Sequence, residues 1–408
     1  MQSSPKRWFF LGIATLSQIS LAVIRMGIPA LTPLIKEELK LSRTQVGILT
    51  SVLNVGTAAA GIPTGKAVDR LGERVIIGYG AIAGGAIIFG INWVWSFAML
   101  LPLLLVTGFV NATSTPAGGK AVAGWFAGKE RGVAMGFRQM GIPVGGAIAA
   151  FTLPPLALRY GWRLAFVFAG AAAILIGLVA LRLYEEPPGP KAPLQTLASV
   201  GPGSLLKRKE FVSLLCYVFI MSGAQWCYLT YLELYLTETL ALSITPAASL
   251  LGLGQICGAG GRIFWGMVSD RFFGAKRGPV LLFVGSVAIL MSLATASLSP
   301  QSPIWLVSLV IALLGFTIQG WNGLSHTLAF ELVGTHVAGL AVGVANTTGF
   351  LGVIFLPPLY GLLVDWTSSY RAAWLALSAI ILPALGMISR VKERGLEDSL
   401  EDHRVGRA

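Results

Sequence analysis

Long apolar runs recur along almost the whole chain, and they constrain its fold more than any other feature. Each run is about 18 residues or longer, enough for a helix to cross a hydrocarbon layer roughly 30 Å thick. Hydrophobic residues make up 55% of the chain and charged residues 12%, about half the charged share of a soluble domain. We therefore predict an all-α membrane protein with twelve transmembrane helices, over residues 8–35, 44–65, 74–93, 96–119, 132–155, 163–184, 211–235, 246–267, 278–298, 303–329, 338–360 and 371–389.

The basic residues indicate how these helices are oriented. Most of the 30 Lys and Arg residues fall in segments that face the cytoplasm if the N-terminus does, as the positive-inside rule requires. We predict both termini in the cytoplasm (N-in/C-in) and a multi-pass protein of the cell inner membrane. The net charge of +12 then reflects topology, and no nucleic-acid partner is expected. The opening segment has no small-residue cleavage site, so we expect it to be a first span and not a signal peptide.

Residue patterns for catalysis or metal binding are absent from the sequence. It has no His-Asp-Glu metal cluster, nucleophile elbow or nucleotide-binding loop. Cys216, Cys227 and Cys257 lie within predicted helices without paired spacing, so we interpret them as small apolar side chains. We therefore expect no enzyme activity, no cofactor and no metal site.

A segment rich in proline and charge separates six predicted spans from the next six. It runs over residues 185–210 and has no helical periodicity. We predict an N-terminal six-helix bundle over residues 1–184, a cytoplasmic linker over 185–210, a C-terminal six-helix bundle over 211–390 and a cytoplasmic tail over 391–408.

The two halves share sequence patterns at corresponding places. GKAVDRLGER, which begins at Gly65, recurs about 201 residues later as GMVSDRFFGAKR, and GVAMGFRQMG, which begins at Gly132, recurs about 207 residues later as GLAVGVANTTG. Parallel six-helix repeats with a substrate site between them are typical of major facilitator transporters. The chain resembles that family over almost its whole length. The resemblance implies that the repeated loop contributes gating residues at the cytoplasmic ends of the bundles, namely Asp69, Arg70, Arg74, Asp270 and Arg271.

Charged groups within the spans are few, and such groups are usually functional because they are costly in lipid. None of the 18 acidic residues falls in the middle third of a span, so we expect no buried carboxylate there. Arg25 lies well inside the first span and Arg138 inside the fifth. A guanidinium is always charged and binds a carboxylate through two parallel hydrogen bonds. We predict that both bind an anion; the alternative is that they extend to an interface or bond to backbone carbonyls.

Neutral polar side chains within the spans supply further candidates for substrate recognition. Buried amides and indoles need hydrogen-bond partners, and they also find them in neighbouring helices. His326, the only histidine inside a span, could also titrate near neutral pH. The predicted neutral binding residues are Gln139, Gln225, Tyr228, Gln255, Trp321, Asn322, His326 and Asn346.

Two further segments resemble branches of this family. NATSTPAGGKAVAGWFAGKERGVAMG, which begins at Asn111, together with Arg25 is similar to the anion-cation symporters, which carry organic acid anions. That branch usually has acids in its first and fourth helices, but this chain has Ile24 and Asn111 there, so those proton-binding groups are missing. GFRQMGIPVGG, which begins at Gly136, resembles the cyanate and nitrate-like permeases. Its small residues favour close, bent helix packing, and we predict a helix-packing pivot at Gly141, Pro143, Gly145 and Gly146.

The sequence therefore predicts a secondary transporter that carries a small organic anion, a mono- or dicarboxylate, by rocker-switch alternating access. The coupling partner could be a proton or a counter-anion, and the fold requires only a monomer in the lipid bilayer. One alternative is a drug-proton antiporter, which would need an acidic residue in its cavity. A second alternative is a receptor-like sensor that binds the same anion without moving it.

Overall fold

The computed structural model describes residues 6–126, 129–187, 205–333 and 338–391. Within these ranges every regular element is helical. Most of the predicted linker and all but the first residue of the predicted tail lie outside the described residues.

The first half contains the helices that correspond to the first six predicted spans. α1 is the first span and α3 the second, while the short α2 follows α1. Two spans consist of two helices each, α5 with α6 and α7 with α8. The bounds are α1 (Arg7–Ala30), α2 (Thr32–Leu39), α3 (Arg43–Leu71), α4 (Glu73–Ile88), the 3-10 helix η1 (Phe89–Trp93), α5 (Phe97–Asn111), α6 (Ser114–Trp125), α7 (Lys129–Gln139), α8 (Gly141–Tyr160) and α9 (Trp162–Leu183).

The second half repeats this order. α3 and α12 match in both bounds, which are displaced by 201 residues, and α5 and α14 match with a displacement of 207 residues. The fourth and tenth spans are both interrupted at the same point of the repeat, between α5 and α6 and between α14 and α15. The bounds are α11 (Lys209–Glu238), α12 (Ile244–Phe272), α13 (Gly278–Ser297), α14 (Ile304–Ile318), α15 (Asn322–Val333), α16 (Ala338–Thr367) and α17 (Tyr370–Ile388).

Eleven helical spans in the described residues are long and apolar enough to cross a membrane. The remaining predicted span, 246–267, coincides with α12, which has 29 residues but is not among the eleven. α12 is rich in glycine and also carries Gln255 and Arg262, which lowers its mean hydropathy. It packs against α8 and α14, so protein and not lipid covers much of its surface.

Capping and small residues explain the local structure. The Ser42 hydroxyl caps α3 by accepting a hydrogen bond from the Gln45 backbone N–H. The Gln45 Oε1 in turn accepts from the Ser42 backbone N–H, which completes a capping box. At the other end of α3, Gly72 adopts a positive φ of 88° in the turn to α4, a conformation that favours glycine. Gly108 lies against the backbone of α3, as expected where transmembrane helices pack through small residues.

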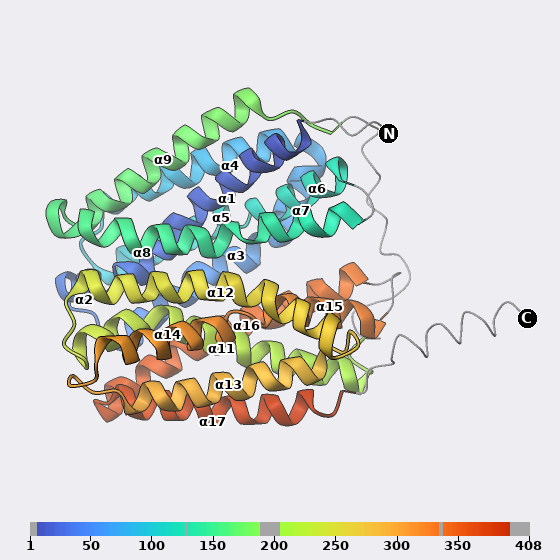
Figure 1. The fold of residues 1–408 in the computed structure, drawn as a ribbon. Coiled ribbons are helices and arrows are strands. Elements are labelled where there is room, and N and C mark those ends of the chain that lie inside the picture. The colour runs from blue at the N-terminus through green and yellow to red at the C-terminus, as the bar shows by residue number, and fades with distance from the viewer. Residues whose placement is uncertain (1–5, 127–128, 188–204, 334–337, 392–408) are drawn as a thin grey trace, which may run out of the picture.

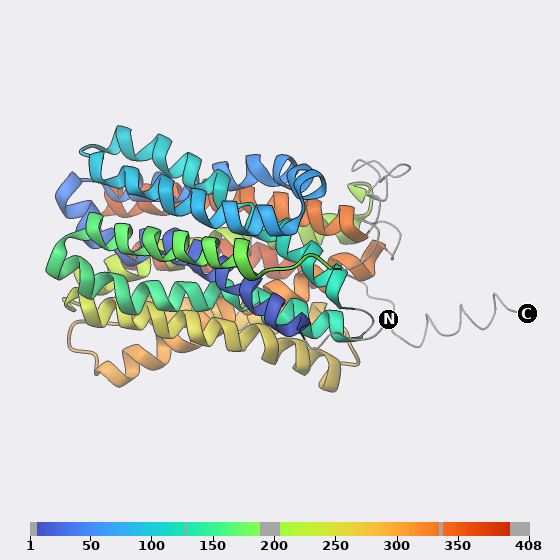
Figure 2. The same ribbon diagram turned by 90° about the horizontal axis from the view of Figure 1, so that it is seen from above.

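The two halves lie side by side, with α1–α9 on one side and α11–α17 on the other (Figure 1). The contact is formed mainly by α3 with α16 and by α8 with α12, and the second pair is also adjacent in the view from above (Figure 2). The beginning of α1 and the beginning of α11 lie at the same end of the bundle (Figure 1). The charge pattern predicts that this end faces the cytoplasm. The opposite end is called the outer end below.

Candidate functional site

A polar cavity of about 130 Å³ opens between α11, α15 and α16 of the second half. Five of the predicted binding residues line it, and four of these five bond to one another in two pairs. The Asn322 Nδ2 donates to Gln225 Oε1 over 2.9 Å, and His326 Nε2 lies 3.0 Å from Asn346 Oδ1. The lining comprises Val218, Ser222, Gln225, Trp226, Trp321, Asn322, His326, Ala345, Asn346, Gly349, Phe350 and Val353.

Two of these residues, Trp321 and Asn322, lie at the break in the tenth span. α14 ends at Ile318, α15 begins at Asn322, and Trp321 lies in the turn between them. The Trp321 indole donates to the Ile318 carbonyl over 3.0 Å, so its N–H is occupied within its own span. Its buried ring packs edge to face against Tyr217, with ring centroids 5.9 Å apart. Trp321 therefore forms a wall of the cavity, while the Asn322 amide belongs to its polar network.

Arg25 joins the first half to this cavity. Its guanidinium lies over the ring of Trp226, 4.6 Å from the centroid, and Trp226 is part of the cavity lining. Its Nη2 donates to Asn54 Oδ1 over 2.5 Å, and its buried Nε has no acceptor in the described residues. The positive charge is thus held by a neutral amide and an aromatic face, and the buried Nε donor has no acceptor among the described residues.

Arg138 lies elsewhere, inside the first half. It is 1% exposed, and its Nη2 donates to the backbone carbonyl of Ser114 in α6. Its side chain fills the space beside Gly118, because a Cβ there would meet Arg138 Nε at 1.7 Å. Neither Arg138 nor the half-buried Gln139 lines the cavity, so their proposed contact with substrate stays a prediction.

Tyr228 and Gln255 pack at helix contacts and do not line the cavity. The buried Tyr228 hydroxyl points at α12, where a Cβ on Gly254 would meet it at 1.8 Å. The Gln255 amide lies 3.7 Å from the Met26 sulfur of α1, so it crosses from one half to the other. Relative motion of the two halves would therefore change the contact that Gln255 makes with Met26.

The glycine-proline stretch of α8 lies at two helix contacts. A Cβ on Gly145 would meet the Ala22 Cβ of α1 at 2.6 Å, and one on Gly146 would meet Gln255 Nε2 of α12 at 2.3 Å. Gly141 faces Thr15 and Gln18 of α1, and Pro143 is buried in α8. Gly141 and Gly145 therefore allow close packing within the first half, and Gly146 allows it at the contact between the halves. The pivoting role of the stretch remains a prediction.

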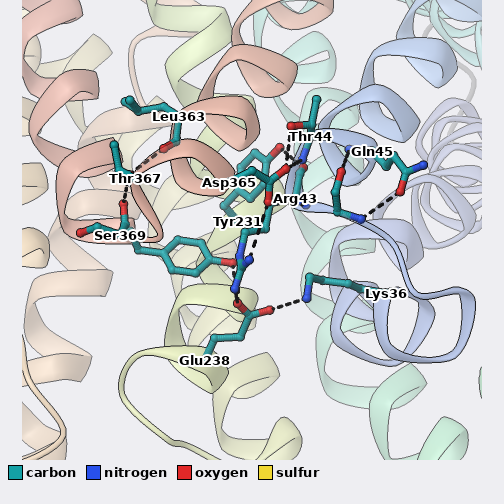
Figure 3. A network of polar contacts seen from close by, with 12 residues as sticks. Lys36, Arg43, Thr44, Gln45, Tyr231, Glu238, Leu363, Asp365, Thr367 and Ser369 are labelled. Carbon is teal, nitrogen blue, oxygen red and sulfur yellow. Dashed lines mark hydrogen bonds and ion pairs between the residues drawn. The ribbon is translucent and has the colours of Figure 1, made fainter.

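A network of ion pairs closes the outer end across the two halves (Figure 3). Arg43, at the start of α3, binds Glu238 at the end of α11 over 2.6 Å, and Lys36 of α2 binds the same carboxylate over 3.0 Å. Asp365 of α16 accepts from the Thr44 backbone N–H over 2.8 Å and from its hydroxyl over 2.7 Å. The sequence reasoning missed this network, because residues at span ends look like ordinary solvated charges.

Just below this network, backbone and hydroxyl contacts continue the seal. The Thr50 and Thr230 hydroxyls lie 3.0 Å apart, and the Ser51 hydroxyl donates to the Ile354 carbonyl over 2.6 Å. A Cβ on Gly47 would meet the Pro357 carbonyl oxygen at 2.5 Å. The two halves are thus in direct contact through their outer portion.

At the cytoplasmic end, the predicted gating acids bond within their own halves. Lys120 of α6 binds Asp69 over 2.9 Å, and Arg277 binds Asp270 over 2.5 Å. Arg74 donates to the Leu181 carbonyl of α9, while Arg70 and Arg271 are exposed. The structure is therefore closed at the outer end by inter-half contacts, and these acids do not contribute to that closure.

The expectation that no carboxylate is buried in the membrane is wrong for Glu233. This side chain is 0% exposed, and both its oxygens lack a hydrogen-bond partner among the residues that the structure describes. The sequence placed it two residues from the end of a span predicted to stop at residue 235. Instead, α11 continues to Glu238, and α1 and α2 of the first half pack against it.

Comparison with known proteins agrees with this architecture. The family model of the Major Facilitator Superfamily matches residues 13–357. The membrane sensor protein UhpC of Escherichia coli is 28% identical over 353 residues, covering 80% of this chain and 79% of that protein. The probable sulfoacetate transporter SauU of Cupriavidus necator is 27% identical over 399 residues, covering 92% of this chain and 91% of that protein.

A solved structure confirms the fold. A bacterial homologue of the human lysosomal transporter Spinster, in an inward-facing and unoccupied conformation, superposes with a TM-score of 0.81 at 20% identity, over 97% of this chain and 99% of that one. The all-helical fold, the matched family and the repeated halves agree. The chain is a multi-pass membrane transporter, not an enzyme, and it belongs to the Major Facilitator Superfamily.

Proposed function

We propose that the protein carries a small organic anion, a mono- or dicarboxylate, by rocker-switch alternating access. The observation that carries the proposal is Arg25, a cation at the contact between the halves that forms no ion pair with a carboxylate in the part of the chain that the structure describes. Its contacts are an amide oxygen at 2.5 Å and an aromatic face at 4.6 Å, and its Nε lacks an acceptor among the described residues. Buried donors normally have acceptors, so an anionic ligand would complete this site.

The cavity chemistry supports a small anion over a lipophilic cation. The described residues that line it supply amides, an imidazole, a serine hydroxyl and indole rings, and none of them is a carboxylate. Its volume of about 130 Å³ corresponds to roughly four waters at about 30 Å³ each, far below the 300–1,000 Å³ of pockets for drug-sized ligands. A drug-proton antiporter would need a cavity acid and more room.

The relatives point toward the same substrate class. SauU is named as a probable transporter of sulfoacetate, a small organic anion. We extend only the class to this chain: an acid anion whose charged end meets Arg25 while the neutral amides of α15 and α16 bind its other polar groups. The two-half fold suits a monomer in the cytoplasmic membrane, with a proton or a counter-anion as the coupling partner.

A sensor built on the same fold is the second candidate, because UhpC is named as a membrane sensor protein. A sensor would bind the anion at Arg25 without moving it across the membrane. Binding data alone cannot separate the two functions. Flux in reconstituted vesicles separates them directly.

The binding part of the proposal is tested by thermal unfolding of the purified protein. Small mono- and dicarboxylates, sulfonates, nitrate, cyanate and lipophilic cations are screened on the wild type, on Arg25→Gln and on Arg159→Gln, an exposed arginine that serves as the matched control. A ligand at about 100 times its Kd stabilises the folded state by about 2.7 kcal/mol. We expect one carboxylate or sulfonate class to stabilise the wild type and Arg159→Gln but not Arg25→Gln. Stabilisation by the cations alone would overturn the proposal.

A further inference from the structure

Glu233 lies on the face of α11 that meets the first half. On a helix, residues at spacings of four and seven share a face, so Trp226, Thr230 and Glu233 form one stripe. Trp226 contacts Arg25 of α1, and Thr230 contacts Thr50 of α3. Both contacts cross between the halves, so Glu233 is directed at the same contact, about 10 Å along the axis from Trp226.

The outer seal isolates this carboxylate from water. The Thr50–Thr230 contact lies nearly one helical turn to its cytoplasmic side, and the Lys36–Glu238–Arg43 cluster lies five residues along α11 toward the outside. Between these two contacts Glu233 is 0% exposed with both oxygens unbonded. Separation of the outer ends would remove the first-half helices from this stripe and admit water to Glu233.

The cations nearest to Glu233 along the contact between the halves bond to other partners. Arg25 of α1 is held by Asn54 and Trp226, and Lys36 of α2 and Arg43 of α3 bind Glu238. In the described chain, no hydrogen bond or ion pair reaches the Glu233 oxygens from these groups or from any other titratable group on the helices packed against α11. Those other groups include Cys257 of α12, His326 of α15, Tyr360 and Asp365 of α16 and Tyr370 of α17.

We propose that Glu233 is a proton-binding site whose occupancy is required for the outer end to close. A charged carboxylate in a dry site without a counter-ion costs several kcal/mol, so the sealed arrangement is favoured when Glu233 is neutral. In the outward-open arrangement the carboxylate reaches water and can take one proton from the outer solution. Each closure of the outer end then carries that proton into the sealed protein.

This site deepens the proposed function, because it names the proton as the coupling ion. The carboxylates that the anion-cation symporter resemblance led us to look for in the first and fourth spans are replaced here by Ile24 and Asn111. Glu233 supplies an acid on a different helix, two turns from the residue that holds Arg25. The link between the proton and transport rests on the proposed function, whereas the link between the proton and outer closure does not.

The test measures outer closure without any substrate. Spin labels are placed at the exposed positions Ala98 and Thr245, at the outer ends of the two halves, after replacement of the native cysteines. Distance distributions are recorded over a pH series for the unsubstituted protein, Glu233→Gln, Glu233→Asp and the control Glu37→Gln, which removes an exposed outer carboxylate.

We expect the ratio of closed to open protein to fall as pH rises, by up to tenfold per pH unit for one linked proton. Glu37→Gln and Glu233→Asp should keep this dependence. Glu233→Gln should favour the closed arrangement while still opening, with a closed-to-open ratio that changes less than twofold over the series. A wild type without pH dependence, or a Glu233→Gln protein that retains it, would overturn the proposal.

Vesicle transport provides the second readout. With an anion carried by the wild type, Glu233→Gln should still exchange that anion across the membrane, but it should lose accumulation driven by a pH gradient. Accumulation that survives in Glu233→Gln would overturn the proton-site proposal. A wild type that carries no organic anion would instead refute the proposed function, and the distance measurement would still decide the role of Glu233.

Discussion

Replacing Gly47 by alanine is expected to open the outer end of the protein. Gly47 of α3 faces α16 of the other half, and an added Cβ would lie 2.5 Å from the Pro357 carbonyl oxygen, a backbone atom that cannot rotate away. Ordinary contact begins at about 3.4 Å, so the two halves must move apart here. Separation of the outer ends removes the clash, which means that the substitution penalises the closed arrangement selectively.

The size of this effect follows from the cost of overpacking. Inserting a methyl group into a well-packed contact costs about 1–3 kcal/mol, which corresponds to a roughly 5- to 150-fold change in the ratio of closed to open protein. Alanine also favours a helix over glycine by about 0.5–1 kcal/mol. Gly61→Ala in the same helix controls for this gain, because a Cβ there meets nothing within 4 Å.

The assay uses the Ala98 and Thr245 label pair described above. We expect Gly47→Ala to shift the distance distribution toward longer distances and to slow transport, whereas Gly61→Ala should match the unsubstituted protein. If Gly47→Ala gives the same distribution and the same transport rate as Gly61→Ala, then the tight contact between α3 and α16 does not control outer closure, and the reasoning fails.

Three further predictions concern the other charged and polar contacts. If Arg138 binds the anion, as the sequence predicts, Arg138→Gln should reduce saturable anion uptake to background; because this side chain packs beside Gly118 and does not line the cavity, unchanged uptake would exclude its role as an anion clamp. Glu238→Gln combined with Asp365→Asn should favour the outward-open arrangement, since each removed ion pair contributes about 0.2–1 kcal/mol. Unaltered label distances in the double variant would show that the ion pairs follow closure without stabilising it. Asn346→Ala removes the contact with the His326 imidazole and should change the ranking of anions in the thermal-unfolding screen. An unchanged ranking would show that neither residue takes part in substrate recognition.

The sequence predicted the helical architecture well, because apolar length and repeated loops are local properties of the chain. The repeat between the Gly65 and Gly266 segments reappears as α3 and α12, whose bounds are displaced by the same 201 residues. The breaks in the fourth and tenth spans, at Thr113 and Gly320, occur at the same point of the repeat. The length of the apolar runs does not predict these breaks. They depend on how each span packs in its bundle.

The candidate site was predictable in part. Arg25 and the amides Asn322 and Asn346 stood out because polar groups are rare in the spans. The sequence did not distinguish Arg138 from Arg25, because each is a single arginine within a predicted apolar helix. Only the structure shows that Arg138 lies away from the cavity. Glu233 was missed because its burial depends on the other half of the protein covering the end of α11, which is a tertiary effect.

Uptake into proteoliposomes of the anion class selected by the thermal screen shows whether Arg25 binds the transported anion. It is measured with the wild type, Arg25→Gln and Arg159→Gln. We expect saturable uptake by the wild type and by Arg159→Gln and none above empty vesicles by Arg25→Gln. Binding without flux in the wild type would instead identify a sensor, and undiminished uptake by Arg25→Gln would contradict the claim that this buried guanidinium binds the transported anion.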